Sequence, residues 1–335
     1  LLIAPSWIGD CVMAQPLLCI LKERHPQADL HVFAGGWTQA LLMRMPEVDK
    51  IINNPFGHGD VKLWQRFRVG RDLRAEHYSS AIILPGSLKS ALVPFFARIP
   101  VRTGYVGESR YSLINDIRHL DEKHLPRMVD RFVALAFPEN STEPLPQVLP
   151  RLSVSRKQQA CAAERFGLNT DKPILALCPG AEYGPAKRWP SRHFATLAAR
   201  YAAKNWSVWI FGSGKDAPIA EEISAQSNTD CINLCGKTNL AEAIDLLALS
   251  RVVVCNDSGL MHVAAALDRP LVAIYGSSSP DHTPPLSAHA EILTLDLECA
   301  PCFERTCPLK HTDCLEKLWP EQVANAVEKV IAKKE

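Results

Sequence analysis

The sequence predicts an α/β fold of two doubly wound parallel sheets, and three observations support this. Short apolar runs rich in β-branched residues alternate with longer helix-like stretches along both halves of the chain, as they do where helices connect parallel strands. Residues 138–155 hold four prolines and almost no hydrophobic periodicity, which is typical of a linker. The length of 335 residues suits two domains of ordinary size. We therefore expect domains at 1–150 and 151–335.

Composition excludes several classes of protein. Hydrophobic residues make up 47% of the chain, enough for two cores, and the net charge of +1 gives no overall attraction to nucleic acid. No run of 18 or more apolar residues occurs, so no membrane span is predicted. The first ten residues resemble a strand rather than a secretion signal, so we expect a cytoplasmic protein whose eleven cysteines are mainly reduced thiols.

In the first half, apolar runs predict strands at 1–5, 29–34, 51–53, 81–84 and 101–106. A helix is expected from about residue 11 to residue 24, and Pro16 should start or kink it. The fourth strand ends in Pro85-Gly86-Ser87, a turn sequence.

In the second half, strands are predicted at 174–178, 208–211, 232–234, 252–255, 271–275 and 292–295. Ser191 is expected to cap a helix that runs to about residue 204, with Phe194, Leu197, Ala198 and Tyr201 on one face. Two such domains would place a cleft between their sheets' carboxyl edges, where ligands of these folds bind.

Residues 252–262, VVVCNDSGLMH, are the most informative stretch. A buried strand leads into the turn Asn256-Asp257-Ser258-Gly259 and then into an alanine-rich helix at 260–267. The backbone N–H groups at such a helix start suit a phosphate. His262 lies four residues after Ser258, so both should face the same side of the helix. The alternative is an ordinary strand–helix unit in which Asp257 only caps the helix.

Two further residues are candidates for chemistry. Asp10 ends the segment PSWIGD at 5–10 after the first strand, so its carboxylate should stand at the cleft as a general base; the alternative is a helix cap. Lys187 and Arg188 lie on the loop at 179–190, which two glycines and three prolines keep non-helical. A cation there can neutralise a leaving phosphate, and the alternative is a pair of solvated surface charges.

Other motifs are weaker. Residues 212–217, GSGKDA, resemble a dinucleotide-binding turn, but no acidic residue ends the following strand. Neither a P-loop lysine motif nor a D-x-D motif occurs, so no metal clamp for a sugar diphosphate is indicated. Four cysteines near the C-terminus have C-x2-C-x4-C-x6-C spacing and could hold zinc or could be free thiols or disulfides; they are Cys299, Cys302, Cys307 and Cys314.

Residues 61–118 concentrate positive charge, with ten basic side chains against four acidic ones and seven aromatic residues interleaved. A basic, aromatic face suits an anionic acceptor or an anionic membrane surface. The alternative is a solvated helix face combined with core aromatics.

Several segments together resemble the ADP-heptose:lipopolysaccharide heptosyltransferases, glycosyltransferase family 9. They are PSWIGD at 5–10, KSALVPFFARIPVRTGY at 89–105, PGAEYGPAKRWP at 179–190, FGSGKD at 211–216 and NDSGLMHVAAALDRPLVAIYGSSSPDHTPPL at 256–286. The match covers both predicted domains. Glu182 and Tyr183 ahead of Lys187 look most like the type II members, since type I members carry hydroxyl residues there.

The resemblance implies a GT-B fold, with two Rossmann-like domains facing a cleft. The N-terminal domain would bind a heptosyl-Kdo-lipid A acceptor and the C-terminal domain ADP-heptose. The implied reaction is an inverting transfer of L-glycero-D-manno-heptose to the first heptose of the lipopolysaccharide inner core, with no cofactor or metal required and no nucleic acid partner. It allows peripheral contact with the cytoplasmic face of the inner membrane. A type I or type III heptosyltransferase, or a two-domain nucleotide-sugar binding protein, stays open as an alternative.

The resemblance also assigns residues. Asp10 matches the base and Lys187 the lysine on the donor phosphates, and both are expected to be catalytic. The expected donor-binding residues are Gly180, Lys187, Arg188, Ser213, Lys215, Asp216, Asp257, Ser258, Gly259, Leu260, Met261 and His262. The expected acceptor-binding residues are Ser6, Trp7, Gly9, Lys89 and Arg102. No role is carried over for the cysteine-rich tail.

Overall fold

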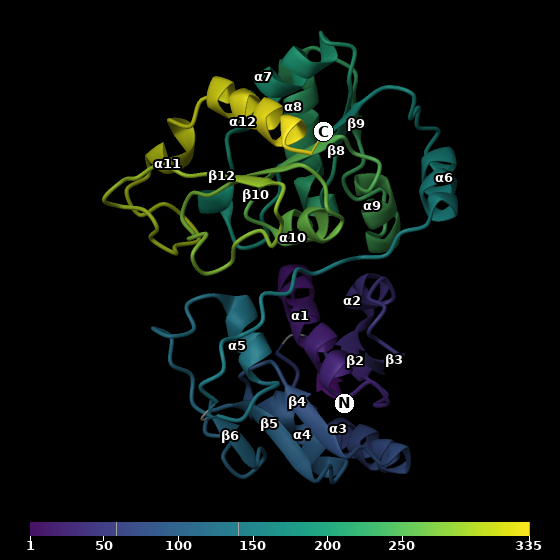
Figure 1. The fold of residues 1–335 in the computed structure, drawn as a ribbon. Helices are drawn as coiled ribbons and strands as arrows, with labels where there is room; N and C mark the ends of the chain where they lie inside the picture. Colours follow the sequence, from purple (N-terminus) through teal and green to yellow (C-terminus); the bar gives the residue numbers. More distant parts are fainter. Residues whose placement is uncertain (58, 140, 335) are drawn as a thin grey trace. The chain divides into compact units, whose positions relative to one another are not determined.

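The computed structural model describes residues 1–57, 59–139 and 141–334, so Asn140, inside the predicted linker, lies outside the described residues. The chain forms two compact units, Leu1–Pro150 and Arg151–Glu335, and the division falls within the proline-rich segment (Figure 1). Each unit contains one six-stranded sheet, and all pairs of neighbouring strands are parallel. The predicted fold of two doubly wound α/β sheets is confirmed. No helix in the described ranges has the length and apolar character that crossing a bilayer requires.

The sheet of unit 1 has the order β3-β2-β1-β4-β5-β6. Its strands are β1 (Leu2–Ile3), β2 (His31–Gly35), β3 (Lys50–Asn54), β4 (Ser80–Ile83), β5 (Val101–Tyr105) and β6 (Asp116–Arg118). Its helices are α1 (Ile8–Arg24), α2 (Gly36–Leu42), α3 (Leu63–Asp72), α4 (Leu88–Phe96) and α5 (Met128–Ala134), with a short 3-10 helix at Leu73–Glu76. Helix α1 packs with α2 and α5, and α3 packs with α4, so the helices form two separate layers.

Unit 1 differs from the sequence-based expectation in three places. Helix α1 begins at Ile8 and continues through Pro16, so Asp10 lies in its first turn rather than in a turn before it. Trp7 occupies the N-cap position, so Asp10 is not the cap. The short elements α2 and β6 were not expected, because seven and three residues are too few to show a clear periodicity.

The sheet of unit 2 repeats the pattern in the order β12-β11-β10-β7-β8-β9. Its strands are β7 (Ile174–Cys178), β8 (Ser207–Ile210), β9 (Cys231–Asn233), β10 (Val252–Asn256), β11 (Leu271–Ile274) and β12 (Ala290–Leu293). Its helices are α6 (Arg156–Arg165), α7 (Ser191–Ala202), α8 (Ala217–Ser227), α9 (Leu240–Leu247), α10 (Gly259–Ala266), α11 (Asp313–Glu316) and α12 (Pro320–Ala332). Helices α7, α8 and α12 pack together, and α9 packs with α6 and α10.

The core of unit 2 lies between its sheet and α7, α8 and α12. The four residues predicted to share one face of α7 are all buried, which confirms that prediction. Ser191 is the first residue of α7 and makes no side-chain cap; Pro190 takes the N-cap position, so the expected capping role is wrong. The Pro190 carbonyl accepts from the N–H groups of His193 at 3.0 Å and Phe194 at 3.2 Å, so the helix starts with backbone hydrogen bonds and without a capping side chain.

Strand order decides where each unit can bind a ligand. Chain connections leave in opposite directions from β1 and β4 in unit 1, and from β7 and β10 in unit 2. Such a switch point opens a crevice at the carboxyl edge of the sheet, where ligands of doubly wound folds bind. In unit 1 it brings together the segments after β1 and β4. In unit 2 it brings together the loop at 179–190 and the turn at 256–259.

Candidate functional site

An ion pair between Lys187 Nζ and Asp257 Oδ2 stands at the switch point of unit 2. Lys187 ends a short 3-10 helix, Pro185–Lys187, after β7, and Asp257 directly follows β10. Their side chains are 17% and 5% exposed, and the Lys187 ammonium also lies 5.1 Å from the centre of the Tyr183 ring. Lys187 is therefore held in place by a carboxylate and an aromatic face, and the alternative of a solvated surface charge is wrong for it.

Asn256, the last residue of β10, fixes the loop that carries Lys187. Its buried side chain donates from Nδ2 to the Pro179 carbonyl at 2.7 Å and accepts at Oδ1 from the Trp189 backbone N–H at 3.0 Å. The Trp189 indole N–H donates to the Leu318 carbonyl at 2.8 Å. Both ends of the 179–190 loop are thus tied down, so Lys187 projects from a rigid support.

The turn after β10 leads directly into α10. Ser258 takes the N-cap position, so Asp257 is not the helix cap and that alternative is wrong. The Met261 N–H donates to the Ser258 carbonyl at 3.1 Å, while the start of the helix directs the N–H groups of Gly259 and Leu260 and the positive end of the helix dipole out of the carboxyl edge. This arrangement beside a fixed ammonium suits a phosphate. The Met261 side chain is buried and accepts from the Tyr275 hydroxyl at 3.4 Å, so it packs in the core.

His262 lies fully inside the unit, within electrostatic reach of the ion pair. Burial lowers the pKa of His262 to about 4; the charge of Asp257 opposes this shift and that of Lys187 adds to it. The imidazole is therefore neutral near pH 7. It can donate or accept a hydrogen bond, but it does not contribute a cation.

Asp216 follows β8, the neighbour of β7, and its carboxylate accepts from the Ser213 backbone N–H at 2.9 Å and hydroxyl at 2.8 Å. A Cβ added at Gly180 would lie 2.6 Å from the Asp216 carboxyl carbon, and one at Gly212 would lie 2.8 Å from the Asp216 Cβ. Any larger residue at Gly180 or Gly212 would collide with the Asp216 side chain, so both glycines allow Asp216 to pack directly against the backbone. Lys215 is exposed and pairs with Glu182 at 2.6 Å.

The remaining predicted donor residues lie on the same edge. The Arg188 guanidinium donates to the Ala181 carbonyl at 3.2 Å, across its own loop. Ser258, Gly259 and Leu260 are partly exposed at the start of α10. The structure thus brings the whole predicted donor set together around the loops that follow β7, β8 and β10.

In unit 1, the first turn of α1 carries Asp10 at the carboxyl edge beside the exposed Ser6 and Trp7. Lys89 lies in the first turn of α4, across the same switch point. Sequence reasoning missed Trp37, whose indole N–H donates to the Ser6 carbonyl at 2.8 Å and which is half exposed. In the sequence, Trp37 could have been found from the segment Gly35-Gly36-Trp37, which directly follows a predicted strand. Exposed aromatic faces next to a carboxylate are suited to binding sugars.

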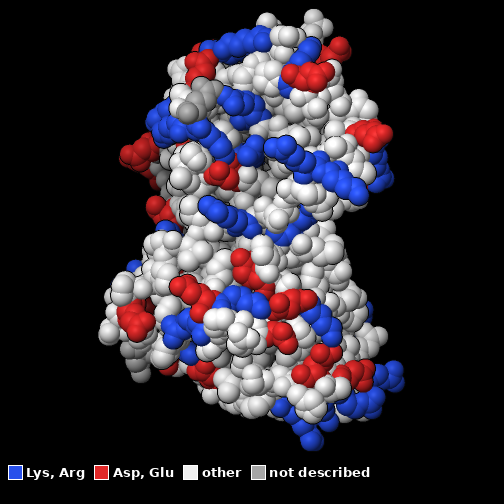
Figure 2. Space-filling view, turned by 45° about the vertical axis from the view of Figure 1, so that its right-hand side comes forward, with Lys and Arg blue, Asp and Glu red and all other residues white. Residues whose placement is uncertain are grey.

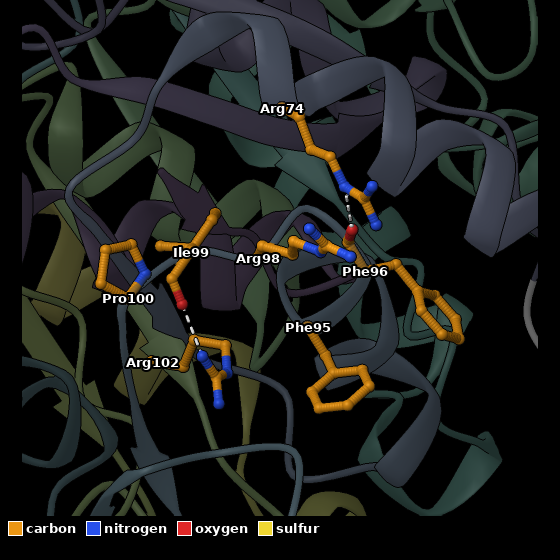
Figure 3. Close-up of a pocket in the computed structure, with 7 residues that line it drawn as sticks. All are labelled: Arg74, Phe95, Phe96, Arg98, Ile99, Pro100 and Arg102. Carbon is orange, nitrogen blue, oxygen red and sulfur yellow. Dashed lines mark hydrogen bonds between the residues drawn. The ribbon is translucent and has the colours of Figure 1, made fainter.

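Arg102 does not join this group. It is the second residue of β5, near the amino edge of the sheet and opposite Asp10, and its guanidinium donates to the Ile99 and Leu113 carbonyls. There it lines a surface pocket of about 330 Å³ (Figure 3). The close-up shows the other lining residues, Arg74, Phe95, Phe96, Arg98, Ile99 and Pro100.

Several arginines of the 61–118 stretch serve the fold rather than the surface. Arg66 is buried and donates to the carbonyls of Asp60, Val61 and Lys89. Arg110 is buried and bonds to three carbonyls, and Arg118 pairs with Asp116 at 2.8 Å. These three guanidiniums are used internally, so they do not add to the basic, aromatic face that the sequence predicts for this stretch. Figure 2 shows basic and acidic side chains interspersed on the visible face.

The cysteine-rich loop at 299–314 supports the donor edge. The Arg305 carbonyl accepts from the Ala186 N–H at 3.1 Å, and the Phe303 carbonyl accepts from the Tyr183 hydroxyl at 2.5 Å. Its four cysteines are free and partly buried, and within the described ranges no set of three histidine, cysteine or acidic residues is arranged to hold a metal. Backbone N–H groups, that of Thr312 foremost, lower the pKa of the Cys307 thiol.

Comparison with known proteins identifies relatives. The family model described as glycosyltransferase family 9 (heptosyltransferase) matches residues 66–313. "Lipopolysaccharide heptosyltransferase 2" of Escherichia coli (strain K12) is 49% identical over 304 residues, 88% of this chain and 87% of the relative. "Lipooligosaccharide heptosyltransferase 2" of Haemophilus influenzae is 49% identical over 306 residues, 88% of each. The solved "Structure of E. coli ADP-heptose lps heptosyltransferase II" superposes with a TM-score of 0.90 at 41% identity, covering 99% of this chain and 98% of that chain.

Proposed function

The chain belongs to glycosyltransferase family 9, the heptosyltransferases, and we propose that it is the type II enzyme of lipopolysaccharide core synthesis. In this proposal it transfers L-glycero-D-manno-heptose from ADP-heptose to the first heptose of the inner core. The GT-B fold of two Rossmann-like units agrees with this activity. The observation that carries the proposal is the Lys187–Asp257 pair beside the start of α10, at the switch point of unit 2.

Unit 2 holds the donor in this proposal. The Lys187 ammonium and the first-turn N–H groups of α10 bind the diphosphate, and they stabilise the charge that develops on it as ADP leaves. Asp257 orients Lys187 in the free enzyme and faces the heptose when the donor binds. The Asp216 carboxylate, held between Gly180 and Gly212, receives the ribose hydroxyls.

Unit 1 supplies the base in this proposal. Asp10 takes the proton of the acceptor hydroxyl while that oxygen attacks the anomeric carbon from the face opposite ADP, which inverts the configuration. The transition state resembles an oxocarbenium ion, as in glycoside hydrolysis. One carboxylate is enough, because the leaving diphosphate needs charge stabilisation rather than protonation. Trp7 and Trp37 offer their exposed faces to the acceptor sugars.

We expect the transfer to need no metal, since the cations that neutralise the diphosphate belong to the chain. Metal analysis of protein purified under reducing conditions, with activity measured before and after chelation, tests this. Stoichiometric zinc on the cysteine-rich loop at 299–314, with activity lost on chelation, would contradict it.

A lipid-anchored acceptor requires the enzyme to work at the cytoplasmic face of the inner membrane, and α3 and α4 offer a surface for that contact. Their aromatic rings form a chain of edge contacts, from Trp64 to Phe67 at 5.9 Å, on to Phe96 at 5.4 Å and to Phe95 at 5.6 Å. Trp64 and Phe95 are exposed at the two ends. Aromatic side chains of this kind are enriched at membrane interfaces.

Cations surround this aromatic chain. Lys62, Arg68, Arg71 and Arg98 are exposed beside it, and two of them have an acidic neighbour: Asp60 lies 2.6 Å from Lys62 and Asp72 lies 3.8 Å from Arg71. Each basic residue near an anionic bilayer contributes about 1 kcal/mol. We therefore propose that α3 and α4 contact the anionic lipid surface.

Turnover of ADP-heptose with three acceptors, which carry no heptose, one heptose or two heptoses, tests the function directly. The type II assignment expects ADP release with an inner core that already carries its first heptose, and little release with a heptose-free core. Preference for the heptose-free core would identify a type I enzyme, and preference for a core that already carries two heptoses a type III enzyme. Tight donor binding without turnover on any acceptor would identify a binding protein.

A further inference from the structure

The loop that follows β11 contains two buried hydroxyls that the site described above does not use. Ser277 and Ser278 are 1% and 6% exposed, and the Oγ atom of each has no hydrogen-bond partner among the described residues. Buried polar groups in folded proteins nearly always have a partner, and leaving one without costs free energy. Two adjacent exceptions at the edge of a binding site therefore indicate a ligand.

The backbone fixes these serines next to the donor site. Strand β11 pairs with β10, so that Asp257 N–H donates to the Ile274 carbonyl at 3.0 Å, three residues before Ser277. The Ser277 N–H donates to the carbonyl of Ala186 at 3.3 Å, and the Ser277 carbonyl accepts from Phe303 N–H at 2.6 Å. Ser277 thus lies between the strand that ends at Asp257 and the loop that carries Lys187, with both backbone groups satisfied and its hydroxyl unused.

The chemistry around the two hydroxyls favours a polyol over a phosphate. Two further buried atoms without a hydrogen-bond partner among the described residues belong to this edge: Nδ1 of His262, whose ring is neutral, and Nε of Arg188 on the loop after β7. Hydroxyls and a neutral imidazole both donate and accept, as sugar hydroxyls do, whereas phosphate oxygens only accept. The diphosphate already has Lys187 and the start of α10.

We propose that Ser277 and Ser278 form a sugar-specificity subsite that hydrogen-bonds the hydroxyls of the donor's heptose. This rests on the proposed function, because it takes the sugar nucleotide at Lys187 as ADP-heptose. The serines bind the transferred sugar and leave the ADP portion to the loops after β7, β8 and β10. They therefore determine which sugar is accepted rather than how tightly the nucleotide binds.

The test is the affinity of ADP and of ADP-heptose, measured by calorimetry without acceptor, for Ser277→Ala, Ser278→Ala and the double variant. Ser250→Ala is the matched control, since Ser250 is also fully buried and also lacks a partner, but precedes β10 at the amino edge of the same sheet. We expect each single variant to bind ADP-heptose about 3- to 10-fold more weakly, as for loss of one hydrogen bond. ADP affinity should stay within about 2-fold, and the control should match the wild type with both ligands.

Three results would overturn the inference. Unchanged affinity for ADP-heptose would mean that the hydroxyls face only buried water. Equal weakening for ADP and ADP-heptose would assign them to the diphosphate or to the fold, and equal effects in Ser250→Ala would make the change nonspecific. Retained ADP binding shows that a variant is folded. If Ser277→Ala is unstable, the same comparison is made with Ser278→Ala alone. Wild-type protein that fails to turn over ADP-heptose would refute the proposed function instead.

Discussion

Replacing Lys187 by methionine keeps most of the apolar stem and removes the ammonium, so it separates the structural and functional roles of the Lys187–Asp257 pair. Breaking a buried ion pair on one side costs about 3–5 kcal/mol, because the remaining charge is left without compensation. Asp257 is 5% exposed while Lys187 is 17% exposed, so the carboxylate left behind has little access to water. We expect Lys187→Met to lower the free energy of unfolding by about 3 kcal/mol.

Asp257→Asn should cost less, about 1–2 kcal/mol, because the ammonium it leaves is more exposed and keeps the Tyr183 ring. The double variant Lys187→Met/Asp257→Asn removes both charges. We expect it to recover most of the loss, to within about 1 kcal/mol of the wild type, since a buried pair is often neutral when it is replaced as a whole.

Urea denaturation and calorimetric titration with ADP provide the two readouts. Lys187→Met and the double variant should both bind ADP at least about 10-fold more weakly, equivalent to about 1.4 kcal/mol, because neither supplies a cation to the diphosphate. Lys317→Met is the control: Lys317 forms an exposed i,i+4 pair with Asp313, and its loss should change stability by about 0.5 kcal/mol or less. A double variant as unstable as the sum of the singles would refute the electrostatic coupling. Wild-type ADP affinity in Lys187→Met would refute the role on the phosphate.

Three other predictions test separate parts of the molecule. Asp10→Asn should reduce turnover about 100-fold or more while ADP affinity stays unchanged, and near-normal turnover would exclude Asp10 as the base. Arg68→Glu/Arg71→Glu should weaken binding to vesicles that contain anionic phospholipid and raise KM for the acceptor but not for ADP-heptose, whereas equal effects on both substrates would remove the case for a lipid surface. Arg66→Glu serves as the contrasting variant and should unfold unit 1, since Arg66 is buried. Burial lowers the pKa of His262 from 6.5 to about 4. Between pH 6.5 and pH 4, His262 is therefore protonated in the unfolded chain but stays neutral in the folded chain. Stability therefore falls as pH drops from about 6.5 to 4, by up to about 3 kcal/mol, and His262→Gln should flatten that part of the urea-stability profile.

The sequence alone determined the class of fold and the segments that form the site. Strand 174–178 was predicted with the bounds that the structure has, because a continuous apolar run bounded by proline and Pro-Gly has few other solutions. The turn after β10 and the loop carrying Lys187 could be predicted because short segments were enough. Their glycine, proline and polar residues indicate turns, and the same segments resemble glycosyltransferase family 9.

Tertiary structure decided the contacts between those segments. Lys187 and Asp257 are 70 residues apart in sequence, and only the strand order that places β7 beside β10 brings them together. Arg66 and Arg68 are indistinguishable as charges in the sequence, yet one is buried against backbone carbonyls and the other is exposed. In the sequence, Ser277 and Ser278 look like ordinary loop residues. Only the packed structure shows that their hydroxyls are buried and have no hydrogen-bond partner among the described residues. Local sequence patterns indicate the backbone conformation and the hydrophobicity of a segment. The burial of a side chain and its ion-pair or hydrogen-bond partners depend on which elements pack against each other, and the folded chain as a whole determines that packing.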